Sequence, residues 1–157
     1  MTPQEIYEHL KKSHDTAVLE FVDQPQTDPF IRVEPSAVFD ICHSLRDDEG
    51  LEFDYMMSLS ATDLGEQLGV VYHLYAMKYR HKIVIKTEVP KDNPLVPSVE
   101  RLWRTADWHE REAFDLIGVV FEGHHNMIRI LLPYDWEGHP LRKDYQAPET
   151  YHGMKVS

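Results

Sequence analysis

The sequence predicts an α+β domain in two layers, with a mixed or antiparallel sheet of about four strands and helices packed on one face. Several short segments alternate apolar and polar residues, and others repeat apolar residues at intervals of three and four. The composition, with 42% apolar and 27% charged residues among 157, is that of one ordinary globular domain. We expect this domain to span residues 1–133 and to be followed by an extended C-terminal docking arm over residues 134–157.

Two amphipathic helices are predicted in the first 50 residues. The first begins at a capping box, with Thr2 as N-cap, Pro3 as the first helical residue and Glu5 as the partner of the cap. The second follows Pro35 and repeats apolar residues on one face: Val38, Ile41, Cys42 and Leu45. We expect the cysteine on that face to be a buried apolar residue and not a reactive thiol.

Strand-like patterns mark five further segments. They are residues 17–23, 30–33, 53–62, 70–79 and 83–89. The last three follow one another through polar turns, which predicts an antiparallel meander. Within the third segment, Tyr55, Met57 and Leu59 share the face that we expect to be better buried.

The next part of the chain carries helical patterns. Residues 99–106 have apolar side chains at helical spacing, and a further helix is expected between Asp107 as N-cap and Gly118 at its end. Within this helix, Arg111 and Asp115 stand four residues apart and can form an ion pair.

Two short strands or extended pieces are predicted after that helix, at residues 119–121 and 127–132. The second contains Arg129 among apolar neighbours. We expect either an ion-pair network with Asp115 and Glu110 or a solvated arginine at this position.

Charge and cysteine content exclude several classes of partner. The formal net charge of −11 repels nucleic-acid phosphates and anionic lipid headgroups. A single cysteine excludes an internal disulfide and an iron–sulfur cluster held by several cysteines of this chain. Neither a signal-peptide pattern nor an apolar run of the roughly 20 residues that span a bilayer is present, so we expect a cytoplasmic location without direct membrane insertion.

The charged stretch around Glu110 and Glu112 is the first place to search for catalysis. On a helix these two carboxylates point about 200° apart, which is a poor arrangement for acid–base chemistry. His109 is followed four positions later by Ala113, where a zinc-protease helix needs a second histidine. Because nucleophile elbows and phosphate loops are also missing, we predict no catalytic centre, cofactor or metal in this chain. A hydrolase that uses Glu110 or Glu112 with a histidine is the alternative from a different class.

The predicted arm, residues 134–157, combines aromatic, turn-forming and charged residues without periodicity. A flexible tail would have few aromatic residues. We expect Trp136, Leu141 and Tyr145 to be anchors buried in a partner, and the charges of residues 142–144 to fix the register.

Three ordered motifs resemble the signature of the 30-kDa-type subunit, also called the C subunit, of respiratory complex I, the NADH-quinone oxidoreductase. They are Glu110-Arg111-Glu112-Ala113-Phe114-Asp115-Leu116, Arg129-Ile130-Leu131-Leu132-Pro133 and the run DWEGHPLRKDY from Asp135 to Tyr145. Members of that family usually read Gly-His-Pro where this chain has Gly123-His124-His125, an exchange that removes a fixed φ from the turn.

The resemblance implies a non-catalytic structural subunit in the hydrophilic arm of a proton-translocating complex, on the cytoplasmic face of the inner membrane. The complex would use FMN, iron–sulfur clusters and quinone, and this chain would bind none of them. Its implied neighbours are the D subunit, which forms the quinone site, and the B and I subunits, which carry iron–sulfur clusters. The alternative is the equivalent subunit of a membrane-bound hydrogenase or of a ferredoxin-driven quinone oxidoreductase. The implied interface or signature residues are Glu110, Arg111, Glu112, Asp115, Arg129, Trp136, His139, Leu141, Arg142, Asp144 and Tyr145.

Overall fold

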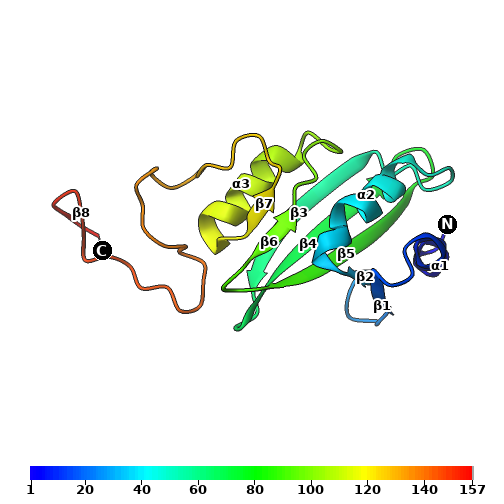
Figure 1. Ribbon diagram of the computed structural model, residues 1–157, viewed down its shortest axis with the longest axis horizontal. Coiled ribbons are helices and arrows are strands. Elements are labelled where there is room, and N and C mark those ends of the chain that lie inside the picture. The colour runs from blue at the N-terminus through cyan, green and yellow to red at the C-terminus, as the bar shows by residue number, and fades with distance from the viewer. Residues whose placement is uncertain (157) are drawn as a thin grey trace.

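The computed structural model describes residues 1–156, which form one five-stranded sheet, two small two-stranded sheets and three α-helices (Figure 1). Strand order in the main sheet is β1-β2-β5-β4-β3, and of these pairs β2–β5 is parallel. The predicted α+β class with a mixed sheet is confirmed, with one strand more than expected. The elements are α1 (Pro3–Ser13), β1 (Val18–Val22), β2 (Phe30–Val33), η1 (Pro35–Ala37), α2 (Val38–Asp47), β3 (Tyr55–Asp63), β4 (Gln67–Ala76), β5 (His81–Pro90), β6 (Leu95–Pro97), α3 (Ala106–Ile117), β7 (Val120–Glu122), β8 (Thr150–Tyr151) and β9 (Met154–Lys155).

Both N-terminal helices form as predicted. In α1 the Glu5 amide donates to Thr2 Oγ1 at 3.3 Å, and the Thr2 amide donates to Glu5 Oε2 at 2.7 Å, which completes the capping box. α2 follows the short 3-10 turn η1 and buries its apolar face. Cys42 on that face is fully buried, and this burial raises the pKa of its thiol. The prediction of an unreactive core cysteine is thereby supported.

Strands β3, β4 and β5 form the predicted antiparallel meander. One face of the sheet is the better covered: α2 lies across the sheet, and α3 packs beside β3 (Figure 1). Alternate side chains of β4 point into the core on this face, and they are Leu68, Val70, Tyr72 and Leu74. The intervening residues of the same strand are half-buried, apart from Gly69.

The predicted facing of β3 is wrong in its first half. The register shifts between Met56 and Ser58, so Met57 is an extra residue that forms a β-bulge. Because one extra residue exchanges the two faces of a strand, Met56 is buried, whereas Tyr55 and Met57 are 44% and 39% exposed. After the bulge the prediction holds, since Leu59 is buried.

The helical spacing of residues 99–106 corresponds to a series of turns, with α3 starting only at Ala106. The turns connect β6 to α3, and β6 itself pairs in parallel with β7. Val99 and Trp103 are buried, and Trp103 Nε1 donates to the Phe53 carbonyl oxygen at 2.9 Å. Consecutive turns of about three residues bury the same apolar positions that a helix would bury. The spacing of apolar residues therefore cannot distinguish a series of turns from a helix.

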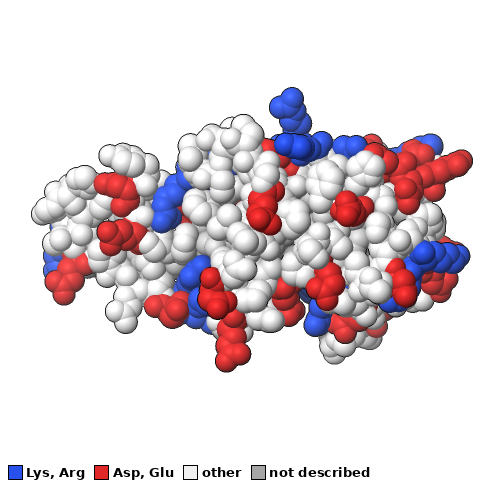
Figure 2. All heavy atoms as spheres, viewed as in Figure 1, with Lys and Arg blue, Asp and Glu red and all other residues white. Residues whose placement is uncertain are grey.

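The C-terminal segment leaves the sheet and ends in the hairpin of β8 and β9 at one end of the molecule (Figure 1). Charged side chains crowd the opposite end of the face shown in Figure 2. Within residues 1–156, no helix combines the length and apolar character needed to cross a bilayer.

Candidate functional site

The beginning of α3 differs from the prediction. Thr105 holds the N-cap position, so Asp107 lies inside the first turn and is not the cap. Glu110 points into the core, where it is fully buried. Ser98 Oγ donates to Glu110 Oε2 at 2.6 Å, and the Val99 amide donates to Glu110 Oε1 at 2.7 Å. These two bonds join α3 to the chain that follows β6.

Burial is the main reason why the pKa of Glu110 rises to about 7, and the negative charges of Glu100 and Asp107 add to the rise. Its two hydrogen bonds act in the opposite direction. A carboxyl group with both oxygens occupied in the core is poorly placed to act on a substrate. Glu112 is exposed, and the two carboxylates therefore face different surroundings, as predicted.

Asp115 forms the central joint of the site. It is fully buried, and Arg129 Nη1 donates to its Oδ1 at 2.8 Å. Its Oδ2 accepts hydrogen bonds from the backbone amides of residues 130, 131 and 132 at 3.1, 2.8 and 2.9 Å. Burial alone would raise the pKa of Asp115, but Arg129 and the amides outweigh it and hold the pKa below its ordinary value. The expected network with Arg129 is confirmed for this carboxylate.

The bonds of Asp115 decide two local predictions, the first of which gave residues 127–132 as a short strand or an extended piece. Residues 127–132 form no strand, since three of their amides donate to the carboxylate and not to a neighbouring strand. The predicted pair of Arg111 with Asp115 is wrong. Arg111 donates instead to the carbonyl oxygens of Ile128 and Arg129, at 3.1 and 3.0 Å. It thus supports the same loop from the other side.

The last carbonyl groups of α3, which have no partners within a helix, are bound by the C-terminal segment. His139, Leu141 and Arg142 contact the carbonyl oxygens of residues 115, 116 and 117 in turn, at 3.0, 2.9 and 2.6 Å. Gly118 follows with φ of +86°, and a Cβ atom there would lie 2.6 Å from Arg142 Nη2. The segment from residue 139 to residue 142 therefore caps the C-terminus of α3.

A second attachment joins the same segment to the sheet. The Lys143 amide donates to Asp63 Oδ2 at 2.8 Å, and Lys91 Nζ lies 3.1 Å from Asp63 and 2.9 Å from Asp144. The hydrogen bond from the Lys143 amide, followed by those from Gly65 and Lys91, holds the pKa of Asp63 well below its usual range. Residues 139–144, which the sequence places in the docking arm, are thus bound to the domain.

The predicted anchors of the arm have different surroundings. Trp136 Nε1 donates to Tyr145 Oη at 3.1 Å, and the Trp136 ring lies 5.2 Å from that of Tyr151. Tyr151 in turn donates to Asp135 Oδ1 at 2.6 Å. Trp136 and Tyr145 are thus half-buried among residues of the arm itself, whereas Leu141 is 60% exposed. Ser157 lies outside the described residues.

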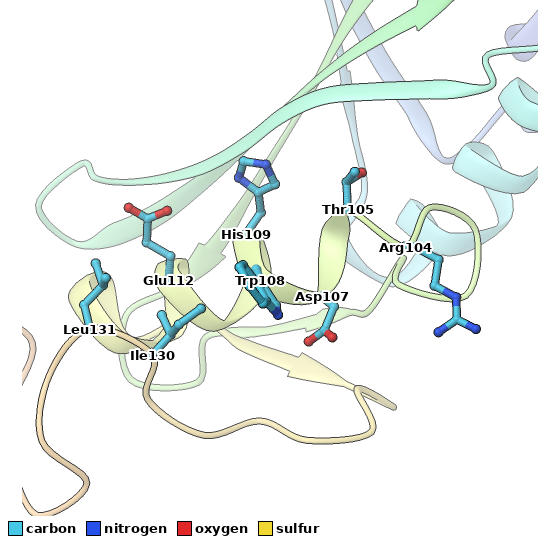
Figure 3. Close-up of a pocket in the computed structure, with 8 residues that line it drawn as sticks. All are labelled: Arg104, Thr105, Asp107, Trp108, His109, Glu112, Ile130 and Leu131. Atoms are coloured by element: carbon cyan, nitrogen blue, oxygen red, sulfur yellow. The ribbon is translucent and has the colours of Figure 1, made fainter.

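An apolar hollow lies beside α3 (Figure 3). Trp108 is 69% exposed and projects next to Ile130, and Leu131 is 64% exposed. These side chains line a cavity of about 550 Å³ together with Glu112 and His109. Large exposed aromatic and aliphatic side chains that gather in one place mark contact surfaces for other proteins. Sequence reasoning placed only Glu112 of this group among the site residues.

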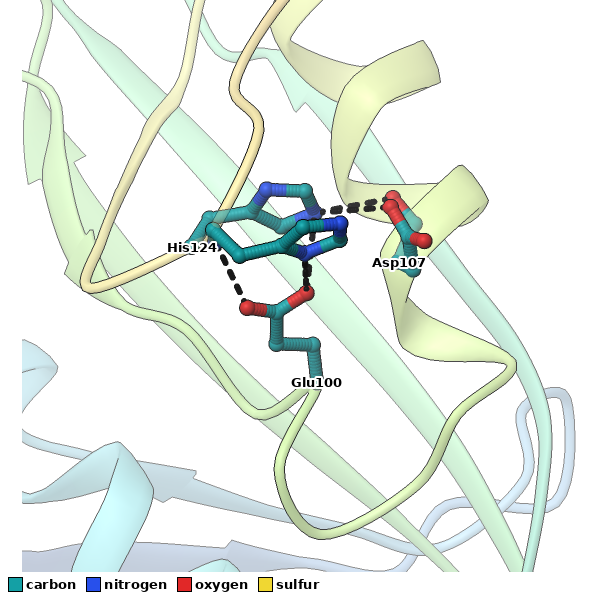
Figure 4. A group of neighbouring side chains, drawn as sticks. Glu100, Asp107 and His124 are labelled. Carbon is teal, nitrogen blue, oxygen red and sulfur yellow. Dashed lines mark hydrogen bonds and ion pairs between the residues drawn. The ribbon is translucent and has the colours of Figure 1, made fainter.

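A second group, Glu100, Asp107, His124 and His125, was also missed (Figure 4). One side-chain nitrogen or oxygen atom from each residue lies within 4.8 Å of the chosen atoms of the other three. The residues come from the turn after β6, the first turn of α3 and the loop after β7. Three segments contribute to the group, so no ligand spacing appears in the sequence. The one signal in the sequence that could have indicated this group was the pair of adjacent histidines, His124 and His125, shortly after a predicted strand.

The fold and these contacts define a small α+β subunit whose motif charges hold its C-terminal segment, with apolar side chains left on the surface. The sequence profile of the family described as "respiratory-chain NADH dehydrogenase, 30 Kd subunit" matches residues 31–151. The chain belongs to this family.

Similar curated proteins carry the name of the C subunit of NADH-quinone oxidoreductase. The protein of Chloroherpeton thalassium is 48% identical over 96% of this chain, and that of Chlorobium phaeobacteroides is 43% identical over 96%. The chain spans 63% of the first protein, 92% of the second and 54% of the relative from Salinispora tropica.

Two solved structures share the fold. A chain of the membrane-bound sulfane sulfur reductase, described as an archaeal respiratory membrane complex, is 25% identical with a TM-score of 0.74, over 91% of this chain and 85% of that one. A trypsin-resistant fragment of Nqo5 is 20% identical with a TM-score of 0.59, over 80% of this chain and 99% of the fragment.

Proposed function

We propose that this chain is the structural, non-catalytic 30-kDa-type subunit of a proton-translocating NADH-quinone oxidoreductase, within the hydrophilic arm of the complex. One observation carries the proposal: Asp115, Arg129, Arg142 and Asp144 all bind groups of the chain itself and so fix the C-terminal segment. The names of the curated relatives support the same conclusion. In this role the chain supports electron transfer from NADH through iron–sulfur centres to quinone without binding FMN, a cluster or quinone.

The proposed neighbours are the D subunit at the quinone site and the B and I subunits with their iron–sulfur clusters, on the cytoplasmic face of the inner membrane. Two surfaces of this chain suit such contacts. The first is the hollow of Trp108, Ile130 and Leu131 beside α3, and the second is the projecting segment of residues 146–156, which holds the hairpin. We place the start of the docking arm after Tyr145, because residues 139–144 are bound to α3 and to Asp63.

The test is assembly of the complex in membranes after a charge is placed in the hollow. Trp108→Glu puts an unpaired carboxylate into an apolar contact. Burial of that charge by the partner has an unfavourable free energy and weakens binding. We expect co-purification of this chain with a tagged neighbouring subunit to fall at least tenfold, together with NADH:quinone activity.

Met77→Glu is the matched control, because Met77 is 58% exposed in the β4–β5 turn, at a distance from the hollow in sequence and fold. It should assemble as the unchanged chain does. Each variant is also purified alone to confirm that its melting temperature is retained. If both variants assemble equally well, the hollow is not part of the interface with a neighbouring subunit.

The related alternative, a subunit of a hydrogenase or ferredoxin-driven complex, is not favoured by the names of the curated relatives. The similarity to a chain of the sulfane sulfur reductase nevertheless makes the electron donor worth measuring directly. Oxidation of NADH by the purified complex supports the proposal, and a complex that accepts electrons only from reduced ferredoxin contradicts it.

A further inference from the structure

The group formed by Glu100, Asp107, His124 and His125 has no role in the proposed function. His125 Nδ1 lies 2.6 Å from Glu100 Oε2, and His124 Nε2 lies 3.5 Å from the same oxygen and 3.1 Å from Asp107 Oδ1. The His124 side chain is completely buried and that of Glu100 is 9% exposed. The rings of His124 and His125 are stacked, with their centroids 5.1 Å apart. Figure 4 shows the Glu100 carboxylate beside the His124 ring and Asp107 approaching that ring from α3.

Asp107 Oδ1 provides a second, independent observation. This oxygen is shielded from solvent and accepts no well-directed hydrogen bond, although His124 Nε2 lies 3.1 Å from it and the Asp107 side chain as a whole is 28% exposed. His124 Nε2 is instead within hydrogen-bonding distance of the Asp107 backbone carbonyl, at 3.2 Å. A buried carboxylate oxygen without a donor is rare in folded proteins and often marks the place of an ion or water.

Carboxyl groups surround His124 on several sides. Glu110 Oε2 lies 4.0 Å from His124 Nε2, so three carboxyl groups surround one buried imidazole ring. Arg101 and Arg104 line the adjoining cavity of about 400 Å³, but neither makes an ion pair with these carboxylates. The cavity also gives an ion a route to Glu100, Asp107 and His125 from solvent.

We propose that Glu100, Asp107, His124 and His125 bind one divalent transition-metal ion of the zinc type. Two imidazole nitrogens and two carboxylate oxygens match the ligand preference of Zn²⁺, whereas Ca²⁺ and Mg²⁺ prefer oxygen alone. Zinc bonds of about 2.0–2.1 Å place tetrahedral ligand atoms about 3.3 Å apart. The contacts of 3.1 and 3.5 Å already fit this spacing, and the 2.6 Å contact opens when the ion replaces the shared proton. The remaining pairs of ligand atoms, which lie within 4.8 Å of one another, adjust to the ion.

Besides these changes in spacing, binding requires a change at the His124 ring. The Asn126 amide donates to His124 Nδ1 at 3.0 Å, so the proton of the neutral ring is at Nε2. Coordination through Nε2 moves this proton to Nδ1 and releases the Asn126 amide, which lies in an exposed loop. Ion binding and a change of the His124 tautomer must therefore occur together.

The ion would add a further link between three segments that already share hydrogen bonds: the turn after β6, the start of α3 and the loop after β7. It would thus stabilise the end of α3 that carries Trp108, without any part in electron transfer. The inference does not depend on the proposed function, because it concerns this chain alone.

The experiment is a calorimetric titration of the full chain with Zn²⁺ after treatment with a chelator. We expect one ion per chain and a rise in melting temperature that saturates at this ratio. His125→Ala should weaken binding at least tenfold while keeping the fold, since His125 is 63% exposed and alanine retains the amide that donates to Glu100. Asp107→Asn should weaken binding as well.

His43→Ala is the matched control, because His43 pairs with Asp47 on exposed positions of α2 and offers an ordinary surface site for zinc. It should leave the strong site unchanged. Binding that is absent, or that is lost with His43 and not with His125, overturns the proposal.

Nitrogen NMR of the His124 ring gives a readout separate from affinity. The ring nitrogen that carries the proton should change from Nε2 to Nδ1 as Zn²⁺ is added. A ring that keeps its tautomer at saturation contradicts the site as proposed, whatever the affinity.

Discussion

Arg129 Nη1 donates to Asp115 Oδ1 at 2.8 Å, and this bond joins α3 to a loop fourteen residues further along the chain. Arg129 Nη2 extends the joint by donating to the carbonyl oxygens of Trp136 and Gly138, at 2.7 and 2.8 Å. One guanidinium group therefore connects the helix, the loop and the C-terminal segment. Its five donors in a planar fork suit this task, which lysine could not perform in the same way.

Replacement of Asp115 by asparagine should destabilise the chain strongly. The variant leaves the Arg129 charge without its partner and turns an amide NH₂ group towards backbone amides that need an acceptor. Breaking a buried ion pair in this way costs about 3 kcal/mol or more of unfolding free energy, which urea denaturation measures. Glu112→Gln, on the exposed side of the same helix, should change it by only about 0.5 kcal/mol. Similar losses for both variants would show that the pair contributes little.

Gly118→Ala and Gly123→Ala form a matched pair for the cap of α3. Both glycines have positive φ, +86° and +81°, so alanine costs about 1 kcal/mol at each. At Gly118 the new Cβ would also lie 2.6 Å from Arg142 and His139, whereas at Gly123 nothing is within 4 Å. We expect Gly118→Ala to destabilise the chain more and to speed tryptic cleavage after Arg142. Equal effects in both assays would mean that the C-terminal segment does not depend on this contact.

The bonds to Asp63 should weaken in acid. The pKa of Asp63 is lower in the folded chain than the ordinary value of about 3.9. Its contribution is therefore complete above that ordinary value and is lost as the pH falls towards the folded pKa. The difference in melting temperature between the unchanged chain and Asp63→Asn should be constant from pH 7 to about pH 5 and shrink at lower pH.

The control for this pH series is Asp23→Asn, at an exposed position after β1, which should change the melting temperature little at any pH. A difference between the unchanged chain and Asp63→Asn that grows in acid would have the wrong sign for a carboxylate stabilised in its charged form.

Two truncations test where the folded domain ends. A chain that ends at Pro133 loses the donors to the carbonyl oxygens of residues 115–117 and the amide that binds Asp63. It should melt several degrees lower than the full chain. A chain that ends at Gln146 keeps all of these bonds and should melt within about 2 °C of it. If the two truncated chains melt at the same temperature, the folded domain ends at Pro133, as the sequence predicted.

Local signals in the sequence predicted much of the fold. The capping box at Thr2, the apolar face of α2, the strand at residues 30–33 and the meander depend on neighbours within a few positions, and all are present. Prediction failed at Tyr55 and Met57, where a bulge exchanges the faces of β3. A bulge depends on pairing with another strand, so the alternation of one strand does not reveal it.

For the motif residues of α3, too, some features followed from the sequence and others only from the tertiary structure. Their types and order were enough for the sequence by itself to determine the family and to offer a network of Asp115 with Arg129 as one of two alternatives, the other being a solvated arginine. Only the tertiary structure decided that Arg111 supports the loop, that residues 139–144 cap α3 and bind Asp63, and that Glu100, Asp107, His124 and His125 meet. The physical reason is that a polar side chain takes the nearest unsatisfied partner in space, and folding brings that partner from a distant part of the chain.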